Sequence, residues 1–177
     1  MKFTETKLPG VYVIEPRRFK DERGFFAPSF RAQDFVARDL ASVFVENNIS
    51  YSNSRGTIRG MHYQAAPHGQ AKLVRCTRGT VFDVAVDLRP ASPTFKEWFG
   101  VELSAENRSM LYVPADCAHG YQTLVDQTEV FYMVSTPYAP ESGRGFRWND
   151  PAFGIEWRDV GATIVIERDQ NYPDFTL

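Results

Sequence analysis

Short runs of β-branched and aromatic residues recur along the chain, and clusters of Gly, Pro, Asn and Asp separate them. Such runs are typical of strands, and a spacing of about 8–12 residues favours a sandwich or barrel over alternating strands and helices. A jelly roll or related small barrel is the leading architecture. The strands that this pattern predicts are 11–14, 72–77, 81–88, 99–103, 110–113, 120–124, 129–134 and 164–167.

Two local patterns make the prediction more specific. Within 81–88, one face carries Phe82, Val84, Val86 and Leu88 and the other carries Val81, Asp83, Ala85 and Asp87, which is the alternation of a strand. Arg78-Gly79 separates this run from 72–77, so we expect a hairpin there. Only 32–41 is patterned as a helix, with Ser29 and Gln33 as weak candidates for its cap.

Composition narrows the class of protein. A chain of 177 residues, 43% hydrophobic and 24% charged, predicts one folded domain over 1–177 and excludes intrinsic disorder. A net charge of −2 lacks the basic excess of a nucleic-acid binder. No apolar run reaches the ~18 residues of a membrane span, and the first residues contain no apolar signal core. We therefore expect a cytoplasmic protein in which Cys76 and Cys117 are buried thiols.

Histidines are few, which limits the possible metal sites. His62 and His119 lie in strand-like segments, whereas His68 lies between Pro and Gly in a loop and has no predicted role. Iron, zinc and manganese sites in barrels use two or three histidines with a carboxylate, and this chain has no His-x-His pair. The sequence therefore predicts no metal site.

Acid–base chemistry without a metal needs a base, a group that orients the base, and a group that holds negative charge. His62 is the candidate base, and the other candidates are Lys72, Tyr132 and Asp169. Taken singly, each has an ordinary structural explanation: a hydrogen-bonded core imidazole, an edge charge, a core aromatic and a solvated carboxylate. The residue types alone leave these alternatives open.

Taken together and in order, the segments resemble the dTDP-4-dehydrorhamnose 3,5-epimerase family of the cupin superfamily. The resemblance extends from about Val11 to Asp169. The segments that carry it are Asp21–Phe26, Asn48 with Ser50 and Ser52, Arg59–Gln64, Gln70 with Lys72–Val74, Gly79–Arg89, Ser92–Phe95, Leu103-Ser104, Pro114 with Ala118–Tyr121, Tyr132, Trp148–Pro151 and Ile155–Trp157.

This resemblance implies an all-β cupin jelly roll (double-stranded β-helix) with short peripheral helices, and a homodimer with exchanged amino-terminal strands. It also implies no cofactor and an isomerase that acts on a nucleotide-linked 4-keto-6-deoxy sugar. In that family pattern His62 is the base paired with Asp169, Lys72 stabilises the enolate, and Tyr132 returns a proton from the opposite face. The implied substrate contacts are His119 near the sugar, Arg23 and Arg59 at the diphosphate, Tyr138 on the nucleotide, and Glu46, Asn48 and Gln64.

Four positions depart from the family pattern: Pro28 replaces a Glu, Glu46 a Gln, Ile49 a His and Arg168 a Lys. An ionised Glu46 only accepts hydrogen bonds and would suit the exocyclic amine of cytosine or guanine, so a CDP- or GDP-linked substrate is one hypothesis. Inversion at C3 or C5 alone is a second alternative. A non-catalytic sugar-nucleotide-binding cupin and a metal-dependent oxygenase or isomerase on the same barrel are the alternatives from other classes.

Overall fold

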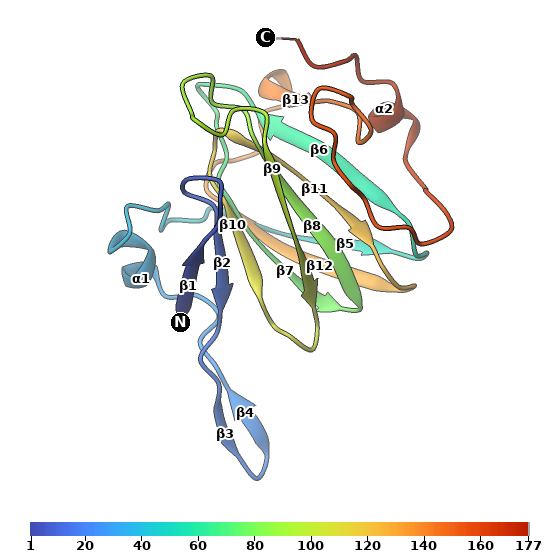
Figure 1. The fold of residues 1–177 in the computed structure, drawn as a ribbon. Coiled ribbons are helices and arrows are strands. Elements are labelled where there is room, and N and C mark those ends of the chain that lie inside the picture. The colour runs from blue at the N-terminus through green and yellow to red at the C-terminus, as the bar shows by residue number, and fades with distance from the viewer. Residues whose placement is uncertain (177) are drawn as a thin grey trace.

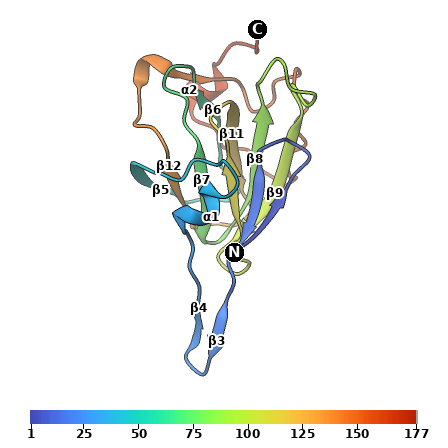
Figure 2. The same cartoon turned by 90° about the vertical axis from the view of Figure 1, so that its left-hand side faces the viewer.

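A computed structural model describes residues 1–176 and contains two facing antiparallel sheets (Figures 1 and 2). The six-stranded sheet has the order β1 (Lys2–Glu5), β2 (Tyr12–Glu15), β10 (Met110–Val113), β7 (Lys72–Arg78), β12 (Thr128–Val134) and β5 (Glu46–Ser52). The five-stranded sheet has the order β13 (Gly143–Gly145), β6 (Ile58–Gln64), β11 (Cys117–Thr123), β8 (Thr80–Asp87) and β9 (Trp98–Ser104). This confirms the all-β prediction.

The remaining elements are short. Strands β3 (Phe19–Asp21) and β4 (Gly24–Phe26) form a separate two-stranded ribbon that projects beyond the sheets as an arm (Figures 1 and 2). The helices are α1 (Ala32–Val36), the 3-10 turn η1 (Pro140–Ser142) and α2 (Glu167–Gln170). Within residues 1–176, every helix is too short or too polar to cross a membrane.

Apolar side chains form three layers around the two sheets. The inner layer contains Val74 and Val130 from one sheet and Val81 and Ala85 from the other, so it fills the space between them. Phe82, Val84 and Val86 pack on the opposite face of β8, under the carboxyl-terminal residues. The alternation predicted for 81–88 is therefore confirmed. The third layer, around Phe35, covers the outer face of the six-stranded sheet.

Three local predictions were wrong. Strands β7 and β8 do not form a hairpin, because Gly79 joins a strand of one sheet to a strand of the other. The run 164–167 is not a strand: Ile164 makes an isolated bridge to Thr57, and α2 begins at Glu167. Helix α1 ends at Val36, well short of Ala41, and its N-cap, Arg31, has no side-chain cap bond.

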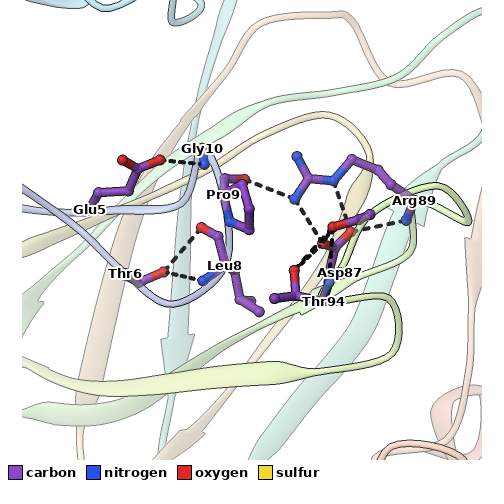
Figure 3. A network of polar contacts seen from close by, with 9 residues as sticks. Glu5, Thr6, Leu8, Pro9, Gly10, Asp87, Arg89 and Thr94 are labelled. Atoms are coloured by element: carbon purple, nitrogen blue, oxygen red, sulfur yellow. Dashed lines mark hydrogen bonds and ion pairs between the residues drawn. The ribbon is translucent and has the colours of Figure 1, made fainter.

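A buried carboxylate connects the β1–β2 turn to the loop that follows β8 (Figure 3). Asp87 is fully buried; its Oδ1 accepts from Nε of Arg89 at 2.8 Å, and its Oδ2 accepts from Ser92 at 2.6 Å and Thr94 at 2.7 Å. Arg89 also donates to the carbonyl of Pro9 at 2.8 Å. Burial acts to raise the pKa of Asp87, but the hydrogen bonds from Arg89, Ser92 and Thr94 outweigh it and hold the pKa far below its usual range.

We expect Asp87→Asn to lower the free energy of unfolding at pH 7 by about 3 kcal/mol, since it breaks a buried, charge-assisted network. The carboxylate stabilises the fold fully above its unfolded pKa of about 3.9, and this contribution is lost as pH falls toward the lower folded pKa. The difference between wild type and variant should therefore shrink progressively below about pH 4. Urea unfolding at pH 7, 4 and 2.5 measures this, with exposed Asp126→Asn as control; a constant difference would contradict it.

Candidate active site

A cavity of about 540 Å³ opens between the two sheets. Its walls come from β6 and β11 of one sheet, from β7 and β12 of the other, and from residues 164–172. Eight of the predicted site residues line it together: Arg59, His62, Gln64, Lys72, His119, Tyr132, Tyr138 and Asp169. The fold therefore brings into one compartment residues that are far apart in the sequence.

A glycine pair explains how β6 and β11 approach each other beside the histidines. Gly60 has φ +132°, and a Cβ there would lie 2.6 Å from Cα of Gly120. Side chains at these positions would separate the strands. The two glycines thus permit the register in which His62 lies opposite His119.

His62 is held by a carboxylate from the other end of the chain. Its Nε2 lies 2.9 Å from Oδ1 of Asp169, which is 1% exposed. Burial acts to raise the pKa of Asp169, but hydrogen bonds and charge from His62, with further bonds from Arg168 and the Gly60 N–H, lower it below its usual value. The carboxylate is therefore ionised and accepts from Nε2–H, which leaves Nδ1 of the imidazole to accept a proton.

Lys72 and Tyr132 come from the six-stranded sheet and line the same cavity as His62. Burial lowers the pKa of Lys72 to about 8, and the charge of Asp83 opposes that shift. Nζ of Lys72 donates to the carbonyl of His62 at 3.4 Å. Burial raises the pKa of Tyr132, although Arg59 acts against it. At neutral pH the cavity thus contains an ammonium group near its titration point and a phenol that keeps its proton.

Sequence reasoning missed a second imidazole–carboxylate pair. Nε2 of His119 lies 2.9 Å from Oδ1 of Asp83, and both residues are buried. Oδ2 of Asp83 is also buried and has no hydrogen-bond partner among residues 1–176. The available signal was the strand pattern, because it places Asp83 on the inner face of β8 between the apolar Val81 and Ala85.

The other predicted substrate contacts lie in different places. Tyr138 is 63% exposed at the cavity, and Glu46 on β5 accepts from its backbone N–H at 3.4 Å. Asn48 is half-buried on β5, opposite Tyr132 in the register. Arg23 lies on the arm, away from this chain's cavity, with its side chain 83% exposed and paired to Asp21.

Gln64 lines the cavity, but its amide is fully engaged with the protein. The amide nitrogen donates to the carbonyls of His68 and Pro137, at 2.8 and 3.2 Å, and the amide oxygen accepts from the N–H of Ala139 at 2.7 Å. These bonds hold the two neighbours of Tyr138. His68, for which no role was predicted, takes part in this network through its carbonyl.

Further cavity residues were not predicted. Tyr121 donates to Ser50 at 2.8 Å, Tyr172 packs edge-on against His62, and the guanidinium groups of Arg144 and Arg168 lie at the rim. With Arg59 and Lys72, four cationic side chains line the cavity, whereas its carboxylate, Asp169, is already paired. This charge distribution favours an anionic ligand. Among residues 1–176, no three potential metal ligands of the His, Cys, Asp or Glu type cluster together.

Because Asp83 raises the pKa of Lys72 against the effect of burial, we expect Asp83→Asn to move that pKa below about 8. Titration of the Lys72 ¹³Cε resonance in selectively labelled protein measures the shift. The exposed Asp126→Asn serves as the matched control and should leave the Lys72 titration unchanged. An unchanged or higher pKa in Asp83→Asn would show that the carboxylate does not act on the ammonium group.

Comparison with known proteins places this geometry in a family. The model for the dTDP-4-dehydrorhamnose 3,5-epimerase family matches residues 5–176. The curated dTDP-4-dehydrorhamnose 3,5-epimerase of Sinorhizobium fredii is 45% identical over 98% of this chain and 89% of its own length.

Solved structures agree with that match. The enzyme of the same name from Elizabethkingia anophelis superposes with a TM-score of 0.95 at 44% identity, covering 99% of this chain and 96% of its own. That from Bacillus anthracis, solved with TDP and PPi bound, has a TM-score of 0.93 at 41% identity, covering 98% and 99%. The cupin jelly roll is confirmed, and the chain belongs to the dTDP-4-dehydrorhamnose 3,5-epimerase family.

Proposed function

We propose that this protein is an isomerase that inverts C3 and C5 of a dTDP-linked 4-keto-6-deoxy sugar. The observation that carries the proposal is the arrangement of the cavity. An imidazole bonded to an ionised carboxylate comes from one sheet, and a protonated phenol comes from the facing sheet. Inversion requires a proton acceptor and a proton donor on opposite faces of the sugar ring.

The first step removes a proton from carbon. Carbons 3 and 5 flank the C4 ketone, so their protons are acidified by enolate formation. Nδ1 of His62 takes the proton, the C–H electron pair becomes the enolate, and Asp169 stabilises the imidazolium that results. Such general base participation contributes typically ~10²–10⁴-fold to the rate.

The second step depends on charge at the ketone oxygen and on the acid. The ammonium of Lys72 neutralises the enolate oxygen, and loss of one such donor costs about 10²–10³-fold. Tyr132 then gives its proton to the same carbon from the other face. The phenolate regains a proton from solvent and the His62 imidazolium releases its proton to solvent, which returns both groups to their starting states. The reaction is neutral in electrons and protons, so it needs no co-reactant.

Recognition of the nucleotide follows from the rim of the cavity. Arg59 provides a guanidinium for the diphosphate, Tyr138 provides an exposed ring for the base, and His119 lies beside the sugar. Glu46 and Asn48 lie toward the base end, and we assign to Gln64 the role of positioning Tyr138. A carboxylate at Glu46 can accept from N3–H of thymine, and the Bacillus anthracis relative holds TDP, so we propose dTDP rather than CDP or GDP as the carrier.

Following solvent deuterium into the sugar by NMR tests this function. Wild type should incorporate deuterium at both C3 and C5 of the dTDP-linked substrate, faster than with the CDP- and GDP-linked sugars. His62→Ala should slow incorporation at both carbons by at least about 10²-fold, since the base is lost. Tyr132→Phe should slow release of inverted product more than it slows exchange.

Each other outcome selects an alternative. Exchange at a single carbon would replace the proposal with single-centre epimerisation. Nucleotide binding without exchange in wild type would replace it with a non-catalytic binding cupin. A preference for the CDP- or GDP-linked sugar would overturn the assignment of the carrier.

We also propose that the single domain over 1–177 works as a homodimer in which the arm reaches the partner's cavity. Phe19, Phe25 and Phe26 on the arm are 51%, 45% and 70% exposed, and Ile49 on the edge strand β5 is 67% exposed. Exposed apolar side chains gathered on a projecting ribbon mark an interaction site. Arg23 at the tip would then contribute to the partner's diphosphate site. The predicted cytoplasmic location stays a prediction.

Mixing two defective variants tests this assembly. Arg23→Ala and His62→Ala should each be nearly inactive, since each lacks a group that every site needs. After unfolding and refolding together in equal amounts, half of the dimers combine the two variants and carry one intact site. About one quarter of wild-type activity should therefore return. No recovery, or a monomeric mass by light scattering, would contradict the exchange of arms.

A further inference from the structure

Residues 148–151, one of the segments that resemble the epimerase family, do not line the cavity. Asp150 is 2% exposed and is not among the residues that line the cavity. Its Oδ1 accepts from the N–H of Ala152 at 2.8 Å and its Oδ2 accepts from the N–H of Phe175 at 2.7 Å. A buried carboxylate outside the chemistry therefore binds the backbone near the carboxyl-terminal end of the chain.

The bond between Asp150 and the N–H of Phe175 attaches one end of a segment that contains Asp169. At the other end, Ile164 exchanges backbone bonds with the barrel: its N–H donates to Gly56 at 2.9 Å and its carbonyl accepts from Ile58 at 2.8 Å. We refer to residues 164–175 as the C-terminal strap, which crosses the molecule beside β6 (Figure 1). Asp169 lies between these two attachments.

The strap cannot hold its own shape. Helix α2 contains four residues, and its N-cap, Ile166, makes no side-chain cap bond. A helix of one turn is unstable by itself, since nucleation fixes several residues for one hydrogen bond. Besides the bonds that Asp169 itself makes to His62 and Gly60, its position therefore depends on contacts on either side of the helix.

The contacts after Asp169 are tight and end at Asp150. Tyr172 packs on Gly145, where a Cβ would lie 2.6 Å from its ring. The ring of Phe175 contacts Phe153 and Phe146, with centroids 5.1 and 5.8 Å apart. Because the four-residue helix α2 is unstable by itself, loss of the attachment at Phe175 would free the strap back toward Asp169.

We propose that Asp150 is a positioning residue for the reaction: it anchors Phe175 and thereby keeps Asp169 in contact with His62. This role rests on the proposed function, because it assumes that the carboxylate of Asp169 assists proton transfer. The bond from Asp169 to His62 is 2.9 Å long, and misplacement of a reacting group by about 1 Å costs on the order of 10²-fold in rate.

A double-mutant cycle on solvent-deuterium incorporation tests this coupling. We expect Asp150→Asn to lower kcat by about 10- to 100-fold while the Kd for dTDP stays within about twofold. In an Asp169→Asn background, Asp150→Asn should have no further effect on kcat, because its target has been removed. Equal losses of kcat in both backgrounds would overturn the proposal.

Amide hydrogen exchange tests the anchoring without relying on activity. In Asp150→Asn, amides of 167–175 should exchange at least about tenfold faster, whereas those of β6 stay protected. An unchanged amide exchange rate in the strap of Asp150→Asn would overturn the anchor. If the strap of Asp150→Asn exchanged faster but the wild-type protein had no epimerase activity, only the proposed function would be wrong.

Two further variants separate anchoring from general stability. Phe175→Ala keeps Asp150 and removes the packing of the strap, so it should reproduce the kinetic and exchange effects even if Asp150→Asn folds poorly. Asp87→Asn removes another buried carboxylate that has no contact with the strap, and folded enzyme should keep wild-type kcat and strap protection. If Asp87→Asn released the strap equally, the specific role of Asp150 would be wrong.

Discussion

The bond between His62 and Asp169 imposes the strongest constraint on this molecule. A carboxylate that is 1% exposed stays ionised only if donors replace the water it has lost. The donors to Asp169 are the imidazole N–H of His62, the guanidinium of Arg168 and the N–H of Gly60. Two of them, those of His62 and Gly60, lie on β6. The carboxyl-terminal end of the chain must therefore return to β6, across 107 residues of sequence.

Two other buried aspartates are supplied with donors to different extents. Asp87 is saturated by Arg89, Ser92 and Thr94, and such a network stabilises the fold without offering a reactive group. Asp83 binds His119 through one oxygen and leaves the other without a partner among the described residues, close enough to Lys72 to raise its pKa. Incomplete pairing thus distinguishes Asp83, which lies beside the proposed chemistry, from Asp87, which only stabilises the fold.

The side-chain pattern predicted seven of the thirteen described strands, β2 and β7 to β12, because half-buried strands show a period of two. It did not predict β1, β3, β4, β5, β6 or β13. It could not predict which strands pair. Gly79 resembles a hairpin turn locally, yet it joins two different sheets, and nothing within a few residues distinguishes these cases. The β-branched run at 164–167 was wrongly predicted as a strand for a related reason. It makes a single bridge to Thr57 and then enters α2, and it does not pair along its length with another strand.

The site illustrates the same limit. His62, Lys72, Tyr132 and Asp169 were found through a family resemblance, since no spacing rule connects positions so far apart. Asp83 carried a local signal, a charge between the apolar Val81 and Ala85 on one face of a strand, but its partner on β11 depended on the register of β8 and β11. Asp150 carried none, because its ligand is a backbone N–H, which is the same in every residue except proline.

The two-sheet architecture itself suits the proposed inversion. A sugar ring bound between facing sheets presents one face to each, so a base on β6 and an acid on β12 attack opposite faces without either having to move. On a single sheet, both groups would reach the same face of the ring and would exchange the proton with retention. The reaction then depends less on the individual pKa values than on keeping the base rigidly on its own side. This is why the anchoring of a short carboxyl-terminal helix matters to chemistry that occurs inside a barrel.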